Sequence, residues 1–506
     1  MIMRTRSQSS RFALALLALS TIDQPLSTSF AQGSLTPLGA PGPTMKSLDQ
    51  IEARTPVDAT HTPGGGTNLF LINQPGAYYL TGNITISSGN AIAMVTNGVT
   101  LDLNGFTISS TNAAADTAIL LSGGSVENIT ILNGHIQGGV KFSFGTFSGT
   151  GFKNGITTLT PFGANPRNVR VSGVTVSGCA NSGINIGAFG STSTERCNVY
   201  ATSGSSGVAS PGISAGTVSD CAVDACNGTA INCLIAANST GTSVGSGVGI
   251  VARSALNCVG TSATGTGLNA TVATGSFGES TGIGSGTGVA ALTANGCYGS
   301  ADNSSGPGVS AEIVTASRGF SSAGVGINAG TASGCYALSG SSTTNALQAS
   351  FVAANCYASA PSSSAGALFS PIVSDSYAQS AGGSAINSTS ALNCYASTAG
   401  SGAAIVASAA ENCYGDGGTG TGMNASTALN CYGTSTGSGS GILVTIAANS
   451  QGTSVGGVGM NILHTGSGCS GSSTTGTGLS AFIANVSHGS SFSGTALSVT
   501  HNVNSY

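Results

Sequence analysis

One short pattern recurs along the chain from about Asp220 to the C-terminus, with a period of about 19 residues. Two of its copies are ALNCYASTAGSGAAIV from Ala391 and ALNCYGTSTGSGSGILV from Ala428. Each copy holds two short segments of alternating apolar and polar residues, joined by turns rich in Gly, Ser and Thr, which is typical of strands. Helical repeats need ~33 residues or more, so this period excludes them. It fits one coil of a parallel β-helix, in which strands of successive coils stack ~4.8 Å apart.

The composition supports a packed stack of coils. Of 506 residues, 79 are Gly, 40% are apolar and only 6% are charged. Disordered chains are poor in apolar residues and rich in charge, so this bias suits a thin core of small side chains instead. We predict an all-β, single-stranded parallel β-helix of about twenty coils, a rod on the order of 100 Å long. The net charge is only −4 and there is no basic stripe, so we do not expect nucleic acid as a partner.

The N-terminus has the pattern of an export signal. Arg4, Arg6 and Arg11 precede a short apolar run, and small residues allow cleavage after Ala31, so residues 1–31 are predicted to be a signal peptide. Residues 32–56 are predicted to be a linker and a short capping helix that begins after Thr44. Irregular N-terminal coils (57–196) and regular coils (197–506) should follow. No later segment is long enough to span a membrane, so we expect a secreted or cell-surface protein.

Particular residue types recur at one place in successive copies. Asn stands immediately before the Cys position, and stacked Asn amides can hydrogen-bond along the axis and satisfy polar groups inside a corner. The Asn row contains Asn257, Asn355, Asn393, Asn412 and Asn430. A second row has Ala three residues before the Cys position, and contains Ala255, Ala294, Ala332, Ala353, Ala391, Ala410 and Ala428.

The Cys position is occupied irregularly. The chain has 13 Cys, an odd number, so in an exported protein at least one is unpaired or bridges two chains. Cys394, Cys413 and Cys431 lie on successive coils, within disulfide range. However, Cys258, Cys297 and Cys469 have Ser, Arg or another residue at the same place in adjacent coils, and the alignment puts Arg318 at this place. We therefore expect a row of small buried thiols rather than a disulfide framework, and no metal site, because no His accompanies them.

Tyr often follows the Cys position. The Tyr row contains Tyr298, Tyr336, Tyr357, Tyr377, Tyr395, Tyr414 and Tyr432. If the row faces outward, it is a flat aromatic stripe on which sugar rings can stack, and Tyr395, Tyr414 and Tyr432 are the candidate ligand-binding residues. If it faces inward, it belongs to the core. We favour packing in the core or at a corner, because stacked aromatic rings stabilise a row without any ligand.

Two segments carry a family resemblance. QPGAYYLTGNIT (Gln74 to Thr85) and GVTLDLNGFTI (Gly98 to Ile108) resemble exported bacterial members of the right-handed parallel β-helix proteins, the pectate-lyase-like superfamily. The other coils match by period and pattern only. The resemblance implies a right-handed helix, and the unequal halves of the repeat lack the hexapeptide rhythm of left-handed ones. Many members of this superfamily degrade uronic-acid polysaccharides, and others are phage tail proteins or surface adhesins.

Catalysis would need charges that most of the chain lacks. A lyase on this fold needs acidic residues that hold Ca²⁺ and an Arg or Lys as base, and a hydrolase needs two or three grouped carboxylates. One region, between Arg167 and Arg253, has enough charges, and its candidate catalytic residues are Arg196, Asp220 and Asp224. The family's hydrolase motifs are missing, so we favour the alternative that these are solvated charges on outer corners.

The sequence therefore predicts an exported, non-catalytic scaffold that acts as a cell-surface, adhesive or glycan-contacting protein and needs no cofactor. The alternative is a lyase or hydrolase of uronic-acid polysaccharides, with Ca²⁺ needed only for the lyase. Extracellular polysaccharide or a cell surface is the expected partner. The last coil has little to cap its open strand edge, so end-to-end self-association is also expected.

Overall fold

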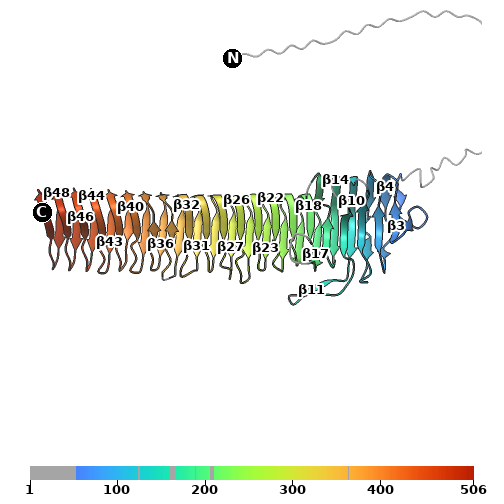
Figure 1. The fold of residues 1–506 in the computed structure, drawn as a ribbon, viewed down its shortest axis with the longest axis horizontal. Coiled ribbons are helices and arrows are strands. Elements are labelled where there is room, and N and C mark those ends of the chain that lie inside the picture. Colours follow the sequence, from blue (N-terminus) through green and yellow to red (C-terminus); the bar gives the residue numbers. More distant parts are fainter. Residues whose placement is uncertain (1–52, 124–125, 160–165, 189, 205–209, 363) are drawn as a thin grey trace, which may run out of the picture. The chain divides into compact units, whose positions relative to one another are not determined.

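The computed structural model describes residues 53–123, 126–159, 166–188, 190–204, 210–362 and 364–506. The predicted signal peptide and capping helix lie outside these residues. Arg54–Tyr506 form one unit, an elongated stack of coils (Figure 1). The described residues contain strands and turns but no helix, and nearly all strand pairs are parallel.

The first coils have three strand segments each, two of which are joined in the long strands β10 and β14. Every segment pairs with its counterpart in the next coil, so that three stacks form. Stack A contains β3 (Asn68–Ile72), β6 (Asn90–Met94), β9 (Thr117–Ser122), β13 (Asn154–Leu159) and β15 (Ser182–Asn185). Stack B contains β1 (Thr55–Pro56), β4 (Gly76–Tyr79), β7 (Val99–Asp102), β10 (Glu127–Gln137), β14 (Arg167–Ser177) and β16 (Thr192–Glu195). Stack C contains β5 (Ile84–Thr85), β8 (Thr107–Ser109), the second halves of β10 and β14, β17 (Asn198–Thr202) and β19 (Ala222–Cys226).

Stacks A and B merge at β18 (Ile213–Ser219), which pairs with both β15 and β16, and each later coil has one long and one short strand. The long strands are β20 (Ile231–Ala237), β22 (Ile250–Leu256), β24 (Leu268–Thr274), β26 (Val289–Asn295), β28 (Val309–Thr315), β30 (Ile327–Ser333), β32 (Leu347–Ala354), β40 (Ile405–Glu411), β42 (Met423–Leu429), β44 (Ile442–Ala448), β46 (Met460–Ser467), β48 (Leu479–Asn485) and β50 (Leu497–Val503). Two coils have a broken long strand, β34 and β35 (Leu368–Phe369, Ile372–Ser374) and β37 and β38 (Ile386–Asn387, Ser390–Leu392). Pro371 explains the first break, because proline has no amide hydrogen for the ladder.

The short strands continue stack C to the end of the chain. They are β21 (Thr240–Ser243), β23 (Val259–Ser262), β25 (Phe277–Ser280), β27 (Tyr298–Ala301), β29 (Arg318–Ser321), β31 (Tyr336–Ser339), β33 (Tyr357–Ala360), β36 (Tyr377–Ser380), β39 (Tyr395–Thr398), β41 (Tyr414–Asp416), β43 (Tyr432–Ser435), β45 (Gln451–Ser454), β47 (Ser470–Ser473) and β49 (His488–Ser491). The stack has about 23 turns of about 19 residues, which confirms the predicted parallel β-helix and nearly matches the predicted number of coils.

The register corrects one alignment made from the sequence. Arg318 pairs with Tyr298 on one side and Tyr336 on the other, so it stands in the Tyr row. Ser317, not Arg318, therefore occupies the Cys position of that coil. Its Oγ accepts a hydrogen bond from the Cys297 amide at 3.1 Å and donates one to the Thr315 carbonyl at 2.8 Å. Ser replaces Cys at this position because both side chains are small and can donate to that carbonyl.

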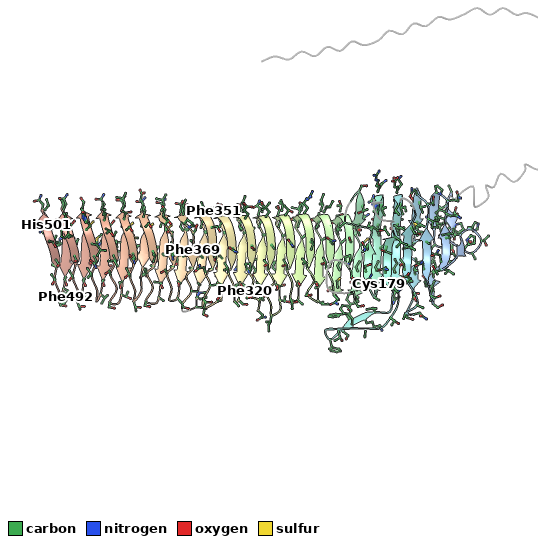
Figure 2. The ribbon with its side chains drawn as sticks, viewed as in Figure 1. Cys179, Phe320, Phe351, Phe369, Phe492 and His501 are labelled. Atoms are coloured by element: carbon green, nitrogen blue, oxygen red, sulfur yellow. The ribbon has the colours of Figure 1, made fainter. Side chains whose placement is uncertain are left out.

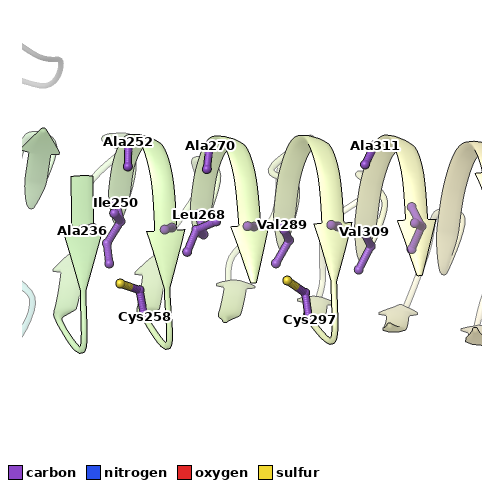
Figure 3. Packing of buried hydrophobic residues seen from close by; sticks show 14 of the residues in the cluster. Ala236, Ile250, Ala252, Cys258, Leu268, Ala270, Val289, Cys297, Val309 and Ala311 are labelled. Atoms are coloured by element: carbon purple, nitrogen blue, oxygen red, sulfur yellow. The ribbon is translucent and has the colours of Figure 1, made fainter. Parts of the chain in front are cut away.

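The core is a narrow seam of small and medium-sized side chains. The first residue of each long strand points inward, and Ile250, Leu268 and Val289 are fully buried (Figure 3). The Cys row borders the same seam, as Cys258 and Cys297 show (Figure 3). The Ala row is buried as well. Each coil thus contributes few core atoms, and stability depends on repeating close contacts from coil to coil.

The corner before the Cys row has a left-handed backbone, which explains its Asn. Asn393, Asn412 and Asn430 have φ values of 51–52°, a conformation that Asn tolerates better than most residues. The Nδ2 of Asn430 donates to Oδ1 of Asn412, and that of Asn412 to Oδ1 of Asn393, both at 3.2 Å. The predicted amide row is therefore confirmed, but it lies on the exposed outside of the corner rather than inside it.

Two hairpins depart from the parallel stack. β2 (Pro63–Gly65) pairs antiparallel with β3 and lies at the N-terminal end of stack A. β11 (Lys141–Ser143) and β12 (Thr146–Ser148) form a hairpin that projects from the side of the stack (Figure 1). Phe144 at its tip is fully exposed. Other single apolar side chains stand out along the regular coils, among them Phe351 and Phe492 (Figure 2).

Candidate functional site

The candidate catalytic residues Arg196 and Asp220 lie on adjacent coils. The pairing of Glu195 with Ser219 and of Asn198 with Ala222 brings them to the same place in the register. Both occupy the left-handed corner, with φ values of 50° and 53°, and both are exposed. They therefore belong to the row that Asn fills in most other coils.

Their side chains bond in opposite directions along the stack. Arg196 Nη2 donates to Ser172 Oγ of the preceding coil at 3.2 Å. Asp220 Oδ1 accepts from Asn238 Nδ2 of the following coil at 3.3 Å. Asp224 lies on β19, faces outward, and accepts from the Ala225 amide at 2.8 Å. The three residues thus line a corner and the strand after it, and each carboxylate already has a local partner.

This arrangement does not fit the Ca²⁺ that the lyase alternative would need. Ca²⁺ takes six to eight oxygen ligands, usually with several carboxylates. Among the described residues, no group of three or more His, Cys, Asp and Glu side chains could hold a metal ion. Nearby Glu195 is paired with Arg170 at 2.5 Å. We therefore derive no reaction step through Ca²⁺ at this corner.

The Tyr row faces outward at the start of the short strands, next to the corner, so the expectation that it lies in the core was wrong. On the short strands, Tyr395, Tyr414 and Tyr432 are exposed or half-exposed, while the residue after each of them is buried. The strand alternation explains this, because the adjacent Cys position and the residue after Tyr both point inward. The sequence shows the alternation, but the small side chains on both faces conceal which face is inside.

Six Tyr rings form one continuous stack, from Tyr336 on β31 to Tyr432 on β43. Neighbouring ring centroids are 4.7–5.2 Å apart, and the first four pairs are parallel within 4°. Each ring inside the row therefore has a neighbouring ring on both of its faces. The Arg318 guanidinium extends the row, 4.9 Å from the Tyr336 ring centroid and 5.6 Å from that of Tyr298. Partial burial raises the pKa of Tyr395, as do its Tyr neighbours, so its hydroxyl stays protonated.

The thirteen Cys are all buried free thiols, as the sequence predicts. Burial raises the pKa of Cys179 and of Cys233, each to about 12. In the pair Cys335 and Cys356, the shared hydrogen bond lowers the pKa of Cys335 and raises that of Cys356. These thiols are packing groups, because all of them are buried where a reagent or a metal ion cannot reach them.

A pocket near the N-terminal end contains functional groups that the sequence analysis missed. It is a cavity of about 730 Å³, lined by Gly66, Thr67, Asn68, Leu69, Thr85, Ile86, Ser87, Ser88, Gly89, Ala114, Asp116 and Lys153. The Asp116 carboxylate and the Lys153 ammonium group lie 3.4 Å apart in it. Its residues come from irregular turns of four coils, so no motif marks them. The only signal in the sequence is that the period is broken in this region.

No protein-family model matches the sequence, and no curated protein matches it significantly. Among solved structures, the A-module of the mannuronan C-5 epimerase AlgE4 from Azotobacter vinelandii is weakly similar. The identity is 12%, with a TM-score of 0.19, over 85% of this chain and 90% of that one. Among the described residues, no helix is long and apolar enough to cross a membrane. The fold assignment therefore rests on the strand register, which makes this chain a parallel β-helix protein.

Proposed function

We propose that the protein is an exported, non-catalytic β-helix rod that contacts polysaccharide or a cell surface along its outer faces. The observation that carries this proposal is the exposed Tyr row. A polysaccharide chain laid along the row would pack against the outward edges of the stacked rings, and Ser359 and Gln379, which flank the row on β33 and β36, offer hydrogen bonds to its hydroxyls. Repetition on consecutive coils would add many weak contacts along one polymer.

The charged corner gives weaker support to an enzyme. A hydrolase needs two carboxyl groups that face each other across the scissile bond. Asp220 lies on the corner and Asp224 on the strand that follows, and each accepts a hydrogen bond from its surroundings. The export part of the proposal rests on the N-terminal signal pattern alone.

Self-association belongs to the same proposal. Within the described residues, β50 pairs only with β48, so its other edge presents backbone donors and acceptors that a second copy could pair with. Sedimentation of the purified protein over a range of concentrations tests this. We expect reversible growth of the assembly, and a monomer at every concentration would contradict it.

The test of function measures binding and turnover in the same samples. Purified protein is incubated with a panel of neutral and uronic-acid polysaccharides with Ca²⁺, and bound protein, unsaturated products and reducing ends are followed. We expect binding without product, and Tyr395→Ala should weaken it about threefold to tenfold, the effect of losing one aromatic contact. Phe492→Ala, which removes a single exposed aromatic ring outside the row, is the matched control. Product that disappears in Asp220→Asn would establish the enzyme alternative instead.

A further inference from the structure

The N-terminal corner pocket, the 730 Å³ cavity described above, is lined by an ion pair, Asp116 with Lys153. It lies where stack C turns into stack A. The turn after β5 and the turn before β9 form two of its sides, and the segment just before β13 contributes Lys153. The β2–β3 hairpin contributes Leu69 and its neighbours. The pocket thus depends on irregular turns that the repeated coils lack.

The ion pair is held in place by the backbone. The amides of Lys153 and Asn154 both donate to the Asp116 carbonyl, at 2.8 and 3.0 Å. The side chains are nevertheless accessible, since Lys153 is 59% and Asp116 49% exposed. An exposed pair of this kind adds little to stability, so exchanging its contact for one with a ligand costs little.

The other lining groups are hydroxyls and one apolar surface. Thr67, Ser87 and Ser88 are exposed and can donate or accept. Leu69 is 44% exposed and offers an apolar patch. A pocket of this volume suits a ligand of a few rings, and its polar groups would fix that ligand's orientation.

The charge balance selects the ligand's chemistry. One carboxylate and one ammonium sum to zero, so an anion would gain Lys153 but meet Asp116, and a cation would face the opposite conflict. A single carboxylate is too few for Ca²⁺. A neutral polyol suffers neither conflict, because vicinal hydroxyls can donate to the two carboxylate oxygens while the ammonium donates to a hydroxyl or ring oxygen. The C–H face of a sugar would pack on Leu69.

We infer that the N-terminal corner pocket binds a neutral saccharide, with Asp116 as the main acceptor and Lys153 as the main donor. This inference rests on the proposed function, contact with glycans, and adds to it a discrete site separate from the Tyr row. The pocket would bind one or two sugar units with defined stereochemistry, whereas the Tyr row would contact a polymer along its length with little selectivity.

Calorimetric titration of the full chain tests the inference. The probes are neutral tetrasaccharides of glucose, mannose and galactose, and trigalacturonate serves as the anionic comparison. We expect at least one neutral probe to bind, and Asp116→Asn to weaken it about tenfold, as the loss of charge-assisted hydrogen bonds predicts. Lys153→Met should weaken it by a similar factor. Glu195→Gln, which disrupts the ion pair with Arg170 far from the pocket, should leave binding unchanged.

The outcomes separate the inference from the proposed function. Equal affinity in wild type, Asp116→Asn and Lys153→Met, with weaker binding in Tyr395→Ala, would overturn the pocket and leave the Tyr row standing. Tighter binding of trigalacturonate than of any neutral probe, lost in Lys153→Met, would show that the pocket selects anions and overturn the neutral-saccharide assignment. No binding of any tetrasaccharide or polymer would overturn both proposals. Unchanged thermal unfolding of each variant would show that the loss is local.

Discussion

Gly433 lies at a place where the short and the long strand of a regular coil approach each other closely. It follows Tyr432 on β43 and points inward, toward the residue that precedes β44. A Cβ atom built on Gly433 would lie 2.2 Å from the Gly441 carbonyl oxygen and 2.6 Å from Ile442 Cγ1. The oxygen belongs to the backbone and cannot rotate away, so Gly433→Ala should force the two strands apart.

The chain itself shows what a wider coil requires. Where the position of Gly433 is occupied by Ala, the position of Gly441 is Ala as well, and all of these residues are fully buried. These pairs are Ala337 with Ala346, Ala358 with Ala367, Ala378 with Ala385, and Ala396 with Ala404. In the other coils from β21 onward both positions are Gly, except in the last, which pairs Gly489 with Ala496. Coil width is therefore set by the two residues together.

The magnitude follows from two opposing effects. Overpacking of a core costs about 1–3 kcal/mol, and the upper part of this range applies here because the obstacle is backbone. Replacing Gly by Ala gains about 0.4–1 kcal/mol by restricting the unfolded chain. Gly433→Ala should therefore destabilise the protein by about 2 kcal/mol.

Urea unfolding followed by far-UV circular dichroism measures this difference. The matched control is Gly82→Ala, because a Cβ built on Gly82 meets no atom within 4 Å, so this variant should be neutral or slightly stabilised. If Gly433→Ala unfolds at the same urea concentration as Gly82→Ala, the sheets are not in close contact there and the reasoning on coil width is wrong.

Three further predictions concern the rows of the stack. Val486 occupies the left-handed corner with φ 45°, a conformation that a β-branched residue tolerates poorly. Val486→Asn should therefore stabilise the protein by about 1 kcal/mol in urea unfolding. Asn412→Ala should destabilise it by a similar amount. A lower urea midpoint for Val486→Asn would contradict this. The thiols should not react with a disulfide reagent at pH 8 until the protein unfolds. The pKa of Cys179 and of Cys233 is raised to about 12 in the folded protein, so these thiols ionise at lower pH in the unfolded chain. The free energy of unfolding should therefore fall as pH rises from about 9 to about 12. Rapid reaction of several thiols in the native protein would refute their burial. Arg318→Ala should lower the free energy of unfolding by about 0.5–1 kcal/mol, because it removes the cation–π contacts with the two rings beside it. Arg318→Tyr should restore this stability by completing the ring stack. Equal urea midpoints for Arg318→Ala and wild type would mean that these contacts do not stabilise the rod.

The repeat predicts the fold because each coil contacts only its neighbours. A constant period implies a constant register, and a constant register puts like residues side by side, as Tyr357 beside Tyr377 shows. The alignment failed at Arg318, where the departure from the repeat is in the residue type rather than in the length of the coil. It also failed to orient the Tyr row, because Gly and Ser on both faces leave the hydrophobic contrast too weak to identify the inside.

The pocket could not be predicted by the same means. Asp116 and Lys153 are 37 residues apart in sequence and belong to turns of different coils, between which the projecting β11–β12 hairpin is inserted. A sequence pattern records neighbours along the chain or at a fixed period, and this pair is neither. Arg196 and Asp220, by contrast, could be paired from the sequence because they lie one coil apart in the register.

Repetition within one chain can therefore serve as an internal comparison. Some positions carry the same residue type in many coils, such as the Asn corner, the Cys or Ser position and the matched Gly or Ala pairs. Backbone conformation and packing determine these residues, because every coil must satisfy both. Residues that no other coil repeats, such as Asp116 and Lys153, are not required by that packing, since the stack continues without them. Only 6% of the residues in this chain are charged, and the packing of the coils does not require an ion pair at a cavity. That contrast directs the search for ligands to the N-terminal turns first and to the Tyr row second.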